Sequence, residues 1–169
     1  MRRFFYDTEF IEERGRIDLI SIGIVGEQDG SPRLYLESSD CDRSRANPWV
    51  RENVFPHLIG NLASNEVIRE EVLLLMKPAA SDPVELWGYY SAYDHVVLCW
   101  LFGTMMDLPP GMPMLTLDVQ QQAIAMGVSK FPPQIGTSHR AIDDALWTRD
   151  AWKFLQLKSR ISRIQGVDF

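Results

Sequence analysis

Residues 2–9 of the chain read Arg-Arg-Phe-Phe-Tyr-Asp-Thr-Glu, an apolar run that ends in two acids spaced two positions apart. The aromatic residues predict a β-strand from Arg2 to Thr8. Side chains two positions apart on a strand point to the same face, so we expect Asp7 and Glu9 to lie side by side. Neighbouring carboxylates repel each other and lose hydration, and a bound cation relieves both costs. The plainer interpretation is that the strand ends here and both acids face water.

The remaining chain alternates strands and helices. Further strands are predicted at Ile17–Val25, Arg33–Glu37 and Val84–Tyr89. Helices are predicted to start at Asn47-Pro48 and to cover Asn65–Lys77, Asp94–Phe102, Thr116–Met126 and Ser138–Leu157. The first three strands have short connections and form a meander, whereas helices surround the fourth. This order predicts an α/β protein whose mixed sheet is flanked by helices.

Length and composition describe an ordinary soluble protein. The chain has 169 residues, of which 46% are hydrophobic and 24% charged, so we expect residues 1–169 to form a single domain. No apolar run approaches the roughly 18 residues that cross a bilayer. Asp7 and Glu9 interrupt the N-terminal segment too early for a signal peptide. Cys41 and Cys99 lack the spacing of a metal site or a disulfide framework. We therefore expect a cytoplasmic protein that is not bound to a membrane.

The net charge of −6 and the pI near 5.0 argue against a protein that holds nucleic acid mainly through a basic surface. They do not exclude a metal-dependent nuclease, because the acids of such a site add negative charge that bound cations reverse locally. Weak contact with the end of a strand is compatible with this charge, whereas long tracking along a duplex is not.

Further acids and one histidine complete a set of candidate site residues. Asp94 opens an apolar helix, where by itself it is a first-turn acid favoured by the helix dipole. His139 and two adjacent acids, Asp143 and Asp144, lie near the start of the last predicted helix. Four carboxylates that converge can hold two divalent metals, and a nearby histidine can take a proton from water. Together these groups indicate metal-dependent hydrolysis of a phosphodiester bond.

Several aromatic residues are candidates for lining this site. Trp87 and the pair Tyr89-Tyr90 lead directly into Asp94, and His95 follows it. These positions are expected to contact a substrate if Asp94 belongs to the site. Other tryptophans are expected in the core, where tryptophan is mostly found: Trp100, Trp147 and Trp152.

Taken together, the Asp-x-Glu pair, the central Asp94 and the spacing from His139 to Asp144 resemble the DEDDh family of 3′–5′ exonucleases over nearly the whole chain. The resemblance selects Asp144 over Asp143. It is closest to the actinobacterial ribonuclease AS group, 3′-exoribonucleases that prefer adenylate-rich RNA. This closer likeness rests on Phe5–Glu12, Leu19–Gly23, Glu85–Trp87 and Ala92–His95.

The resemblance implies a ribonuclease H-like fold with a five-stranded mixed sheet, and a homodimer. Only four strands are predicted from the residues themselves. The fifth is expected between the Thr116 helix and the last helix, or at Leu115–Leu117.

The resemblance also implies a mechanism. Two Mg²⁺ or Mn²⁺ ions would be held by Asp7, Glu9, Asp94 and Asp144, and His139 would act as the general base. The substrate would be the 3′ end of single-stranded RNA, with the preference for A-rich RNA implied by the resemblance alone, and the products would be 5′-nucleoside monophosphates. Backbone groups near Thr8 and Phe10 would contact the terminal 3′-hydroxyl, and Phe10 would wedge beside the last base. Glu9 is one candidate partner for the 2′-hydroxyl that distinguishes RNA from DNA.

Three alternatives stay open. The first is a 3′–5′ DNA exonuclease of the proofreading type, which competing RNA and DNA strands would reveal. The second is a non-catalytic module that binds strand ends, which metal-dependent turnover would exclude. The third is an unrelated α/β protein with scattered surface acids, which calorimetry without Mn²⁺ binding would favour.

Overall fold

A six-stranded sheet with the order β4-β3-β2-β1-β5-β6 organises the computed structural model, which describes residues 2–165. The first three strands pair antiparallel as the predicted meander, and the outer pairs β1–β5, β5–β6 and β3–β4 are parallel. The mixed sheet is therefore confirmed. Its strands are β1 (Arg2–Glu13), β2 (Arg16–Gly26), β3 (Arg33–Ser38), β4 (Leu62–Ala63), β5 (Val84–Gly88) and β6 (Leu117–Asp118).

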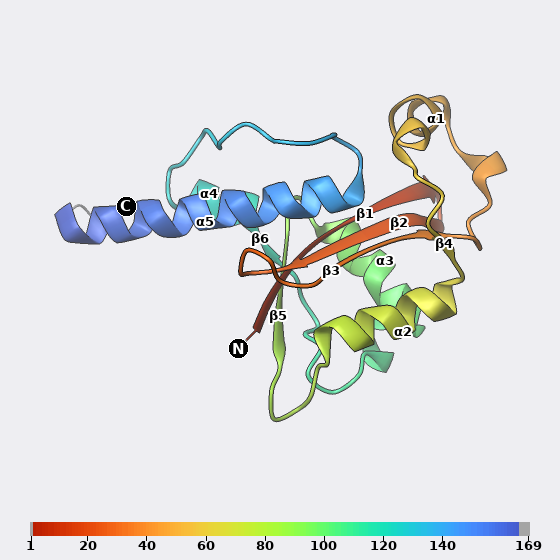
Figure 1. Ribbon diagram of the computed structural model, residues 1–169, viewed down its shortest axis with the longest axis horizontal. Helices are drawn as coiled ribbons and strands as arrows, with labels where there is room; N and C mark the ends of the chain where they lie inside the picture. Colours follow the sequence, from red (N-terminus) through yellow and green to blue (C-terminus); the bar gives the residue numbers. More distant parts are fainter. Residues whose placement is uncertain (1, 166–169) are drawn as a thin grey trace.

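Helices cover both faces of this sheet, with α5 on one face and α2 and α3 on the other (Figure 1). Within residues 2–165, no helix is long and apolar enough to cross a membrane. The α-helices are α1 (Pro48–Asn53), α2 (Asn65–Met76), α3 (Ala92–Phe102), α4 (Val119–Ala125) and α5 (Ala141–Gln165). Short 3₁₀ helices occupy Arg43–Arg45, Phe55–His57 and Met105–Asp107.

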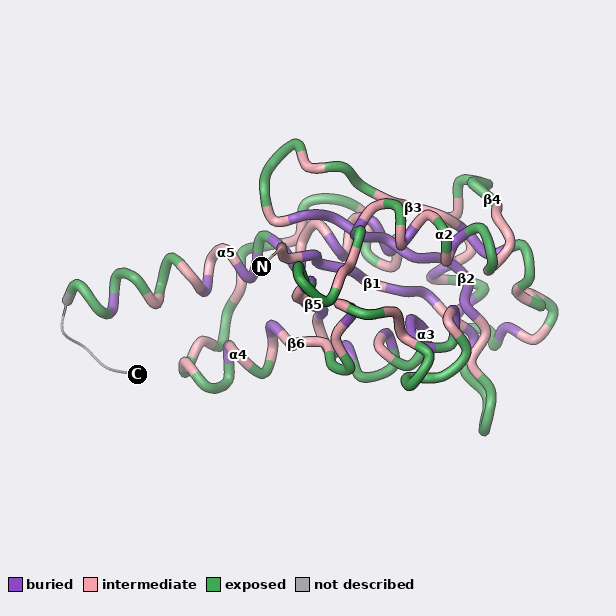
Figure 2. The backbone as a smooth tube through the Cα atoms, turned by 90° about the horizontal axis from the view of Figure 1, so that it is seen from below, coloured by how far each residue is buried: buried purple, intermediate pink, exposed green. Residues whose placement is uncertain are grey.

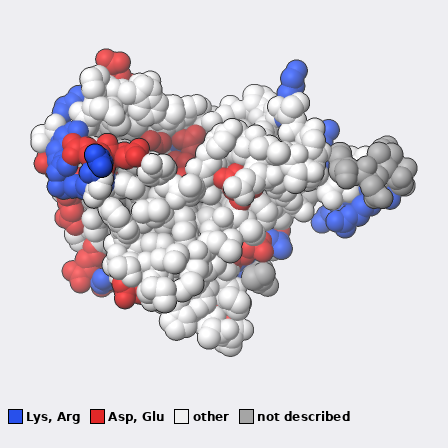
Figure 3. Space-filling model, turned by 180° about the vertical axis from the view of Figure 1, so that it is seen from behind, with Lys and Arg blue, Asp and Glu red and all other residues white. Residues whose placement is uncertain are grey.

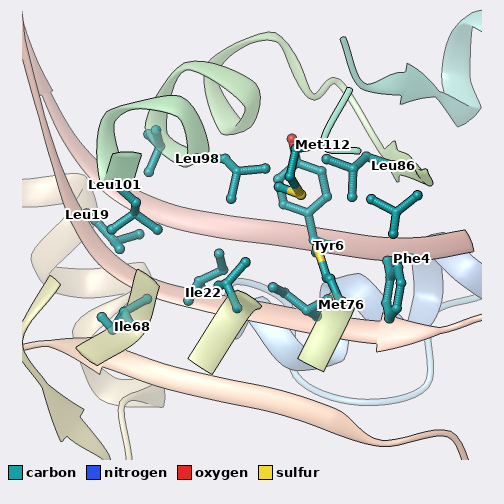
Figure 4. Packing of buried hydrophobic residues seen from close by; sticks show 14 residues of the cluster. Phe4, Tyr6, Leu19, Ile22, Ile68, Met76, Leu86, Leu98, Leu101 and Met112 are labelled. Carbon is teal, nitrogen blue, oxygen red and sulfur yellow. The ribbon is translucent and has the colours of Figure 1, made fainter. Parts of the chain in front are cut away.

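The two faces of β1 enter different parts of the core, because alternate side chains of a strand point in opposite directions. Phe4 and Tyr6 pack with residues of α2 and α3, as Figure 4 shows. Phe5 points to the other face, where its ring centroid lies 5.4 Å from that of Trp152 on α5. Figure 2 shows β1 running through the buried centre of the molecule. Asp7 and Glu9 follow Phe5 on the α5 side of this strand.

β1 extends to Glu13 rather than ending at Thr8, because its pairing with β2 continues to the end of the hairpin. Gly15 closes that hairpin in the left-handed region, with φ of 78°. Asp7 and Glu9 therefore lie inside a paired strand. This excludes the plainer interpretation that the strand ends at these two acids.

The sheet has six strands rather than five, because two strands of two residues extend its edges. β6 pairs with β5 through Leu117 and Asp118, so α4 begins at Val119 instead of Thr116. The Asp118 carboxylate then caps α4 by accepting a bond from the Gln120 N–H at 2.8 Å. The last helix also differs from the prediction: it begins at Ala141 and continues to Gln165.

Candidate active site

Asp7, Glu9 and Asp144 form a carboxylate cluster in which one oxygen of each lies within 4.8 Å of the others. Asp7 and Glu9 come from the middle of β1, and Asp144 comes from the first turn of α5. The cluster lies in an open pocket of about 390 Å³. Figure 3 shows acidic side chains in a recess on the face opposite to that seen in Figure 1. Acids from distant parts of the chain thus meet in one pocket.

Asp94 lines the same pocket from the first turn of α3. Its buried Oδ1 accepts two hydrogen bonds from Thr8, one from the backbone N–H at 2.8 Å and one from the hydroxyl at 2.6 Å. Thr8 therefore holds Asp94 beside the cluster. The Thr8 N–H is engaged in this bond, so the structure does not leave it free for the terminal 3′-hydroxyl expected from the sequence.

The two neighbouring acids of α5 have different partners. Asp143 accepts a hydrogen bond from the Thr137 N–H at 3.1 Å and lies 3.7 Å from the Arg140 guanidinium, so it ties the preceding loop to the helix. Asp144 instead faces the pocket, where the Gln134 side-chain amide donates to its Oδ1 at 2.7 Å. Gln134 lies in a proline-containing loop, and no sequence motif identifies it.

His139 lies in the loop before α5 and lines the pocket. Its backbone has φ of 64°, a left-handed conformation that few residues other than glycine adopt. Its imidazole contacts the ring of Trp49 edge to face, with 4.9 Å between the ring centroids. The sequence gives no signal for Trp49, because it lies in a short helix without a catalytic motif.

Burial dominates the electrostatics of the four acids. It raises the pKa of Asp7 well above its usual range, and the charges of Asp94, Glu9 and Asp144 raise it further. Burial and the charges of Asp144 and Asp94 raise the pKa of Glu9 to about 8. The pKa of Asp94 rises to about 6 through burial, against the opposing effect of the Thr8 hydrogen bonds. Burial also raises the pKa of Asp144, although its bond from Gln134 lowers it.

The three clustered acids fit a divalent cation, and Asp94 lines the same pocket. Carboxylate oxygens are the donors that Mg²⁺ and Mn²⁺ prefer. Within residues 2–165, none of the four forms an ion pair with a lysine or arginine. A cation among them would therefore supply the positive charge that the protein itself does not provide.

Aromatic residues border the pocket on two sides. Tyr89 and Trp147 line it with 4.8 Å between their ring centroids, so Trp147 is not the core residue expected from the sequence. Phe10 also lines it and stacks on Tyr93 with 5.8 Å between centroids. Planar rings at these positions are suited to contact a nucleobase.

Two of the predicted substrate contacts lie outside this pocket. Trp87 is buried beside Trp152, and its indole N–H donates to Glu85 at 2.7 Å. His95 lies 3.1 Å from the Thr116 hydroxyl and lines a separate surface pocket. Both residues are near Asp94 or its strand in sequence, but strand and helix geometry point their side chains elsewhere. Trp100 is also not a core residue, since it is 48% exposed.

Gly23 allows α5 to reach the sheet. It pairs with Asp7 across β1 and β2. A Cβ atom at this position would lie 2.4 Å from backbone atoms of Ala141 and Ile142. The start of α5 therefore occupies the space where any other residue would place a side chain. This close approach brings Asp144 to Asp7.

The sheet, its helices and the converging acids define the class of ribonuclease H-like exonucleases. The zinc-bound complex of Escherichia coli exonuclease I with single-stranded DNA has a TM-score of 0.66 at 11% identity, covering 98% of this chain and 42% of that chain. The RNase domain of the yeast Pop2 protein has a TM-score of 0.58 at 15% identity, covering 99% and 81%. At these identities the similarity concerns the fold, and it confirms the predicted ribonuclease H-like architecture.

Sequence similarity identifies the family. Residues 2–156 match the model of the 3′-5′ exoribonuclease Rv2179c-like domain. The 3′-5′ exoribonuclease Rv2179c of Mycobacterium tuberculosis strain H37Rv is 41% identical over 147 residues, which cover 85% of this chain and 86% of that relative. The chain belongs to the Rv2179c-like family of 3′-5′ exoribonucleases. This confirms the predicted exoribonuclease resemblance and enzyme class.

Gly23→Ala is expected to lower the rate of RNA shortening by about 100-fold. The added methyl group pushes the first turn of α5 away from β1, and a displacement of about 1 Å at a catalytic group can have an effect of this size. Overpacking should also lower the free energy of unfolding by about 1–3 kcal/mol. Gly26→Ala on the same strand is the matched control, because its Cβ would meet only the Ser31 side chain. Equal losses in both variants would contradict the assigned role of Gly23.

Proposed function

We propose that the chain is a metal-dependent exoribonuclease that removes 5′-nucleoside monophosphates from the 3′ end of single-stranded RNA. The observation that carries this proposal is the meeting of Asp7, Glu9, Asp144 and His139 in one pocket of a chain from an exoribonuclease family. A preference for A-rich RNA is part of the proposal and rests on the resemblance to ribonuclease AS.

The acids of the pocket would hold two Mg²⁺ or Mn²⁺ ions. Asp7, Glu9 and Asp144 would bind one ion, and Asp94 with Asp7 would bind the other, directly or through water. Bound divalent ions supply charge compensation for the phosphodiester and make water more acidic. Thr8 contributes by fixing the Asp94 carboxylate through its two hydrogen bonds.

His139 would act as the general base that accepts a proton from the attacking water. Its imidazole lines the pocket, and within residues 2–165 neither ring nitrogen forms a hydrogen bond. Both nitrogens are therefore available for water. Phe10, stacked on Tyr93, is the proposed wedge beside the terminal base, and Tyr89 and Trp147 would border the same nucleotide.

The single-domain organisation of residues 1–169, the homodimer and the cytoplasmic location stay predictions. The dimer is implied by the resemblance. Exposed apolar side chains lie near the β6 edge of the sheet and could be covered by a second copy: Tyr90, Met114, Leu115 and Ile124.

A gel of 5′-labelled strands tests the proposed activity. With Mg²⁺, A-rich RNA is expected to give a ladder of shortening products, while matching DNA stays largely intact. Asp144→Ala should lower this rate by about 10³-fold, because it removes one carboxylate that holds the metal. Asp150→Ala is the matched control and should retain most activity, since Asp150 is an exposed acid of the same helix outside the pocket.

The outcomes separate the alternatives. Shortening of DNA as fast as RNA would identify a general or DNA exonuclease. Absence of shortening with both Mg²⁺ and Mn²⁺ would contradict the catalytic proposal and favour a module that binds strand ends. A U-rich RNA degraded as fast as the A-rich strand would contradict the base preference alone.

A further inference from the structure

We infer that Trp49 is a positioning residue that orients the imidazole of His139. The inference deepens the proposed function and rests on it, because that proposal makes His139 the general base. The two rings lie 4.9 Å apart between centroids, with an angle of 80° between their planes. Trp49 does not itself line the carboxylate pocket. Its contact with the proposed machinery is the one with the His139 ring.

Besides the Trp49 contact, His139 is restrained at its backbone, which hydrogen-bonds to the Asp144 carboxylate. It lies in a loop before α5, and its left-handed backbone with φ of 64° is a conformation that the surrounding structure must maintain. No group within residues 2–165 donates to or accepts from either imidazole nitrogen. A general base needs a third group that fixes its orientation. Here the edge-to-face contact with Trp49 fills that role without occupying a ring nitrogen.

Trp49 is presented by a helix that the surrounding structure holds firmly. The Asn47 side chain caps α1 by accepting a bond from the Val50 N–H at 2.9 Å, and Pro48 occupies the first turn. The Arg51 guanidinium donates to the carbonyl of Ser44 at 2.6 Å. The indole therefore stands on an anchored element, although α1 has only six residues.

The same strand anchors α1 and carries two of the site acids. Val50 and Val54 are buried against Ile11 of β1. Ile11 follows Asp7 and Glu9 on the same face, since strand side chains alternate. β1 thus sets the position of the carboxylates and of the helix that holds Trp49. Trp49 nevertheless stays 52% exposed, so burial in the core does not explain its position.

Kinetics of Trp49→Ala and Trp49→Phe test this inference with A-rich RNA and Mg²⁺. Trp49→Ala is expected to lower the single-turnover rate at saturating RNA by about 10–100-fold, because misplacing a catalytic group has effects of this size. KM and the affinity for Mn²⁺ should change less than about twofold, because a loss confined to the catalytic step leaves binding unchanged. Trp49→Phe should restore most of the rate. Trp100→Ala is the matched control, since Trp100 is 48% exposed but lies on α3.

A double-mutant cycle gives the sharper test. If Trp49 acts through His139, then adding Trp49→Ala to His139→Ala should cause no further loss. NMR coupling constants that report χ1 of His139 supply a readout without metal or RNA. They should show one rotamer in the native chain and in Trp49→Phe, and averaging in Trp49→Ala.

A higher KM at an unchanged rate, or additive losses in the cycle, would overturn the inference and assign Trp49 to RNA binding. An unchanged His139 rotamer in Trp49→Ala would also overturn it. The proposed function fails differently: the native chain would not shorten RNA, or His139→Ala would not slow it. The NMR comparison would still report whether Trp49 orients the ring.

Discussion

The Glu9→Gln variant is expected to be more stable than the native chain at pH 8.5 without metal. Burial and the charges of Asp144 and Asp94 raise the pKa of Glu9 from 4.5 to about 8. Between these values the unfolded chain has released the proton that the folded chain still holds. The stability of the native chain therefore falls as pH rises through this window. Glutamine does not ionise, so the variant avoids this loss.

The difference at pH 8.5 should be on the order of 2–4 kcal/mol, because one pKa unit corresponds to about 1.4 kcal/mol. It should nearly vanish at pH 4.5, where the native carboxyl is protonated in the folded state. Denaturant unfolding with EDTA at both pH values measures it. Equal stabilities of the native chain and Glu9→Gln at pH 8.5 would contradict the raised pKa of Glu9.

Adding Mn²⁺ should reverse the order of stability. The native chain gains the binding free energy of the ion, whereas the variant lacks one carboxylate ligand. RNA shortening by Glu9→Gln should fall by about 10³-fold, as expected from losing several kcal/mol of transition-state stabilisation. Glu12→Gln on the same strand is the control, because Glu12 is exposed and lies outside the pocket.

His139→Ala should lower the rate of RNA shortening by about 10²–10⁴-fold, the contribution typical of a general base. Its affinity for Mn²⁺ should stay near that of the native chain, because the imidazole is not part of the carboxylate cluster. Activity of the variant should rise with pH, since hydroxide replaces the missing base. Single-turnover kinetics and metal titration by calorimetry measure both quantities.

His95→Ala is the control for this variant. His95 contacts the Thr116 hydroxyl and lies outside the carboxylate pocket. The His95→Ala variant should therefore shorten RNA at nearly the native rate. A His139→Ala protein that loses metal affinity as strongly as activity would contradict the assignment of His139 as the base. Comparable losses in His95→Ala would point to a general effect of histidine removal.

The fold was largely predictable because its main strands carry strong local patterns. Aromatic and β-branched runs identify β1, β2, β3 and β5, and Asn47-Pro48 correctly predicts the start of α1. β4 has no such pattern, and β6 was expected only as one of two positions for a fifth strand, at Leu115–Leu117. Each has only two residues and exists because a neighbouring strand supplies its hydrogen bonds. The length of β1 also depends on pairing with β2, which a propensity for strand formation alone does not reveal.

The candidate site was partly predictable for a similar reason. The alternation of β1 places Asp7 and Glu9 together, and the spacing of the family pattern distinguishes Asp144 from Asp143. Trp87 and His95 were misplaced because nearness to Asp94 in sequence does not determine direction in space. Gln134 and Trp49 have no signal in the sequence, because a loop and a short helix bring them to the site through tertiary contacts alone.

The order in which the site residues are synthesised has a consequence for the nascent chain. β1 supplies Asp7 and Glu9 early, whereas His139 and Asp144 arrive with α5. A chain that has emerged from the ribosome only as far as α4 therefore lacks the proposed base and one proposed metal ligand. Domains begin to fold during synthesis, but here catalysis must wait for the last helix to dock on Gly23.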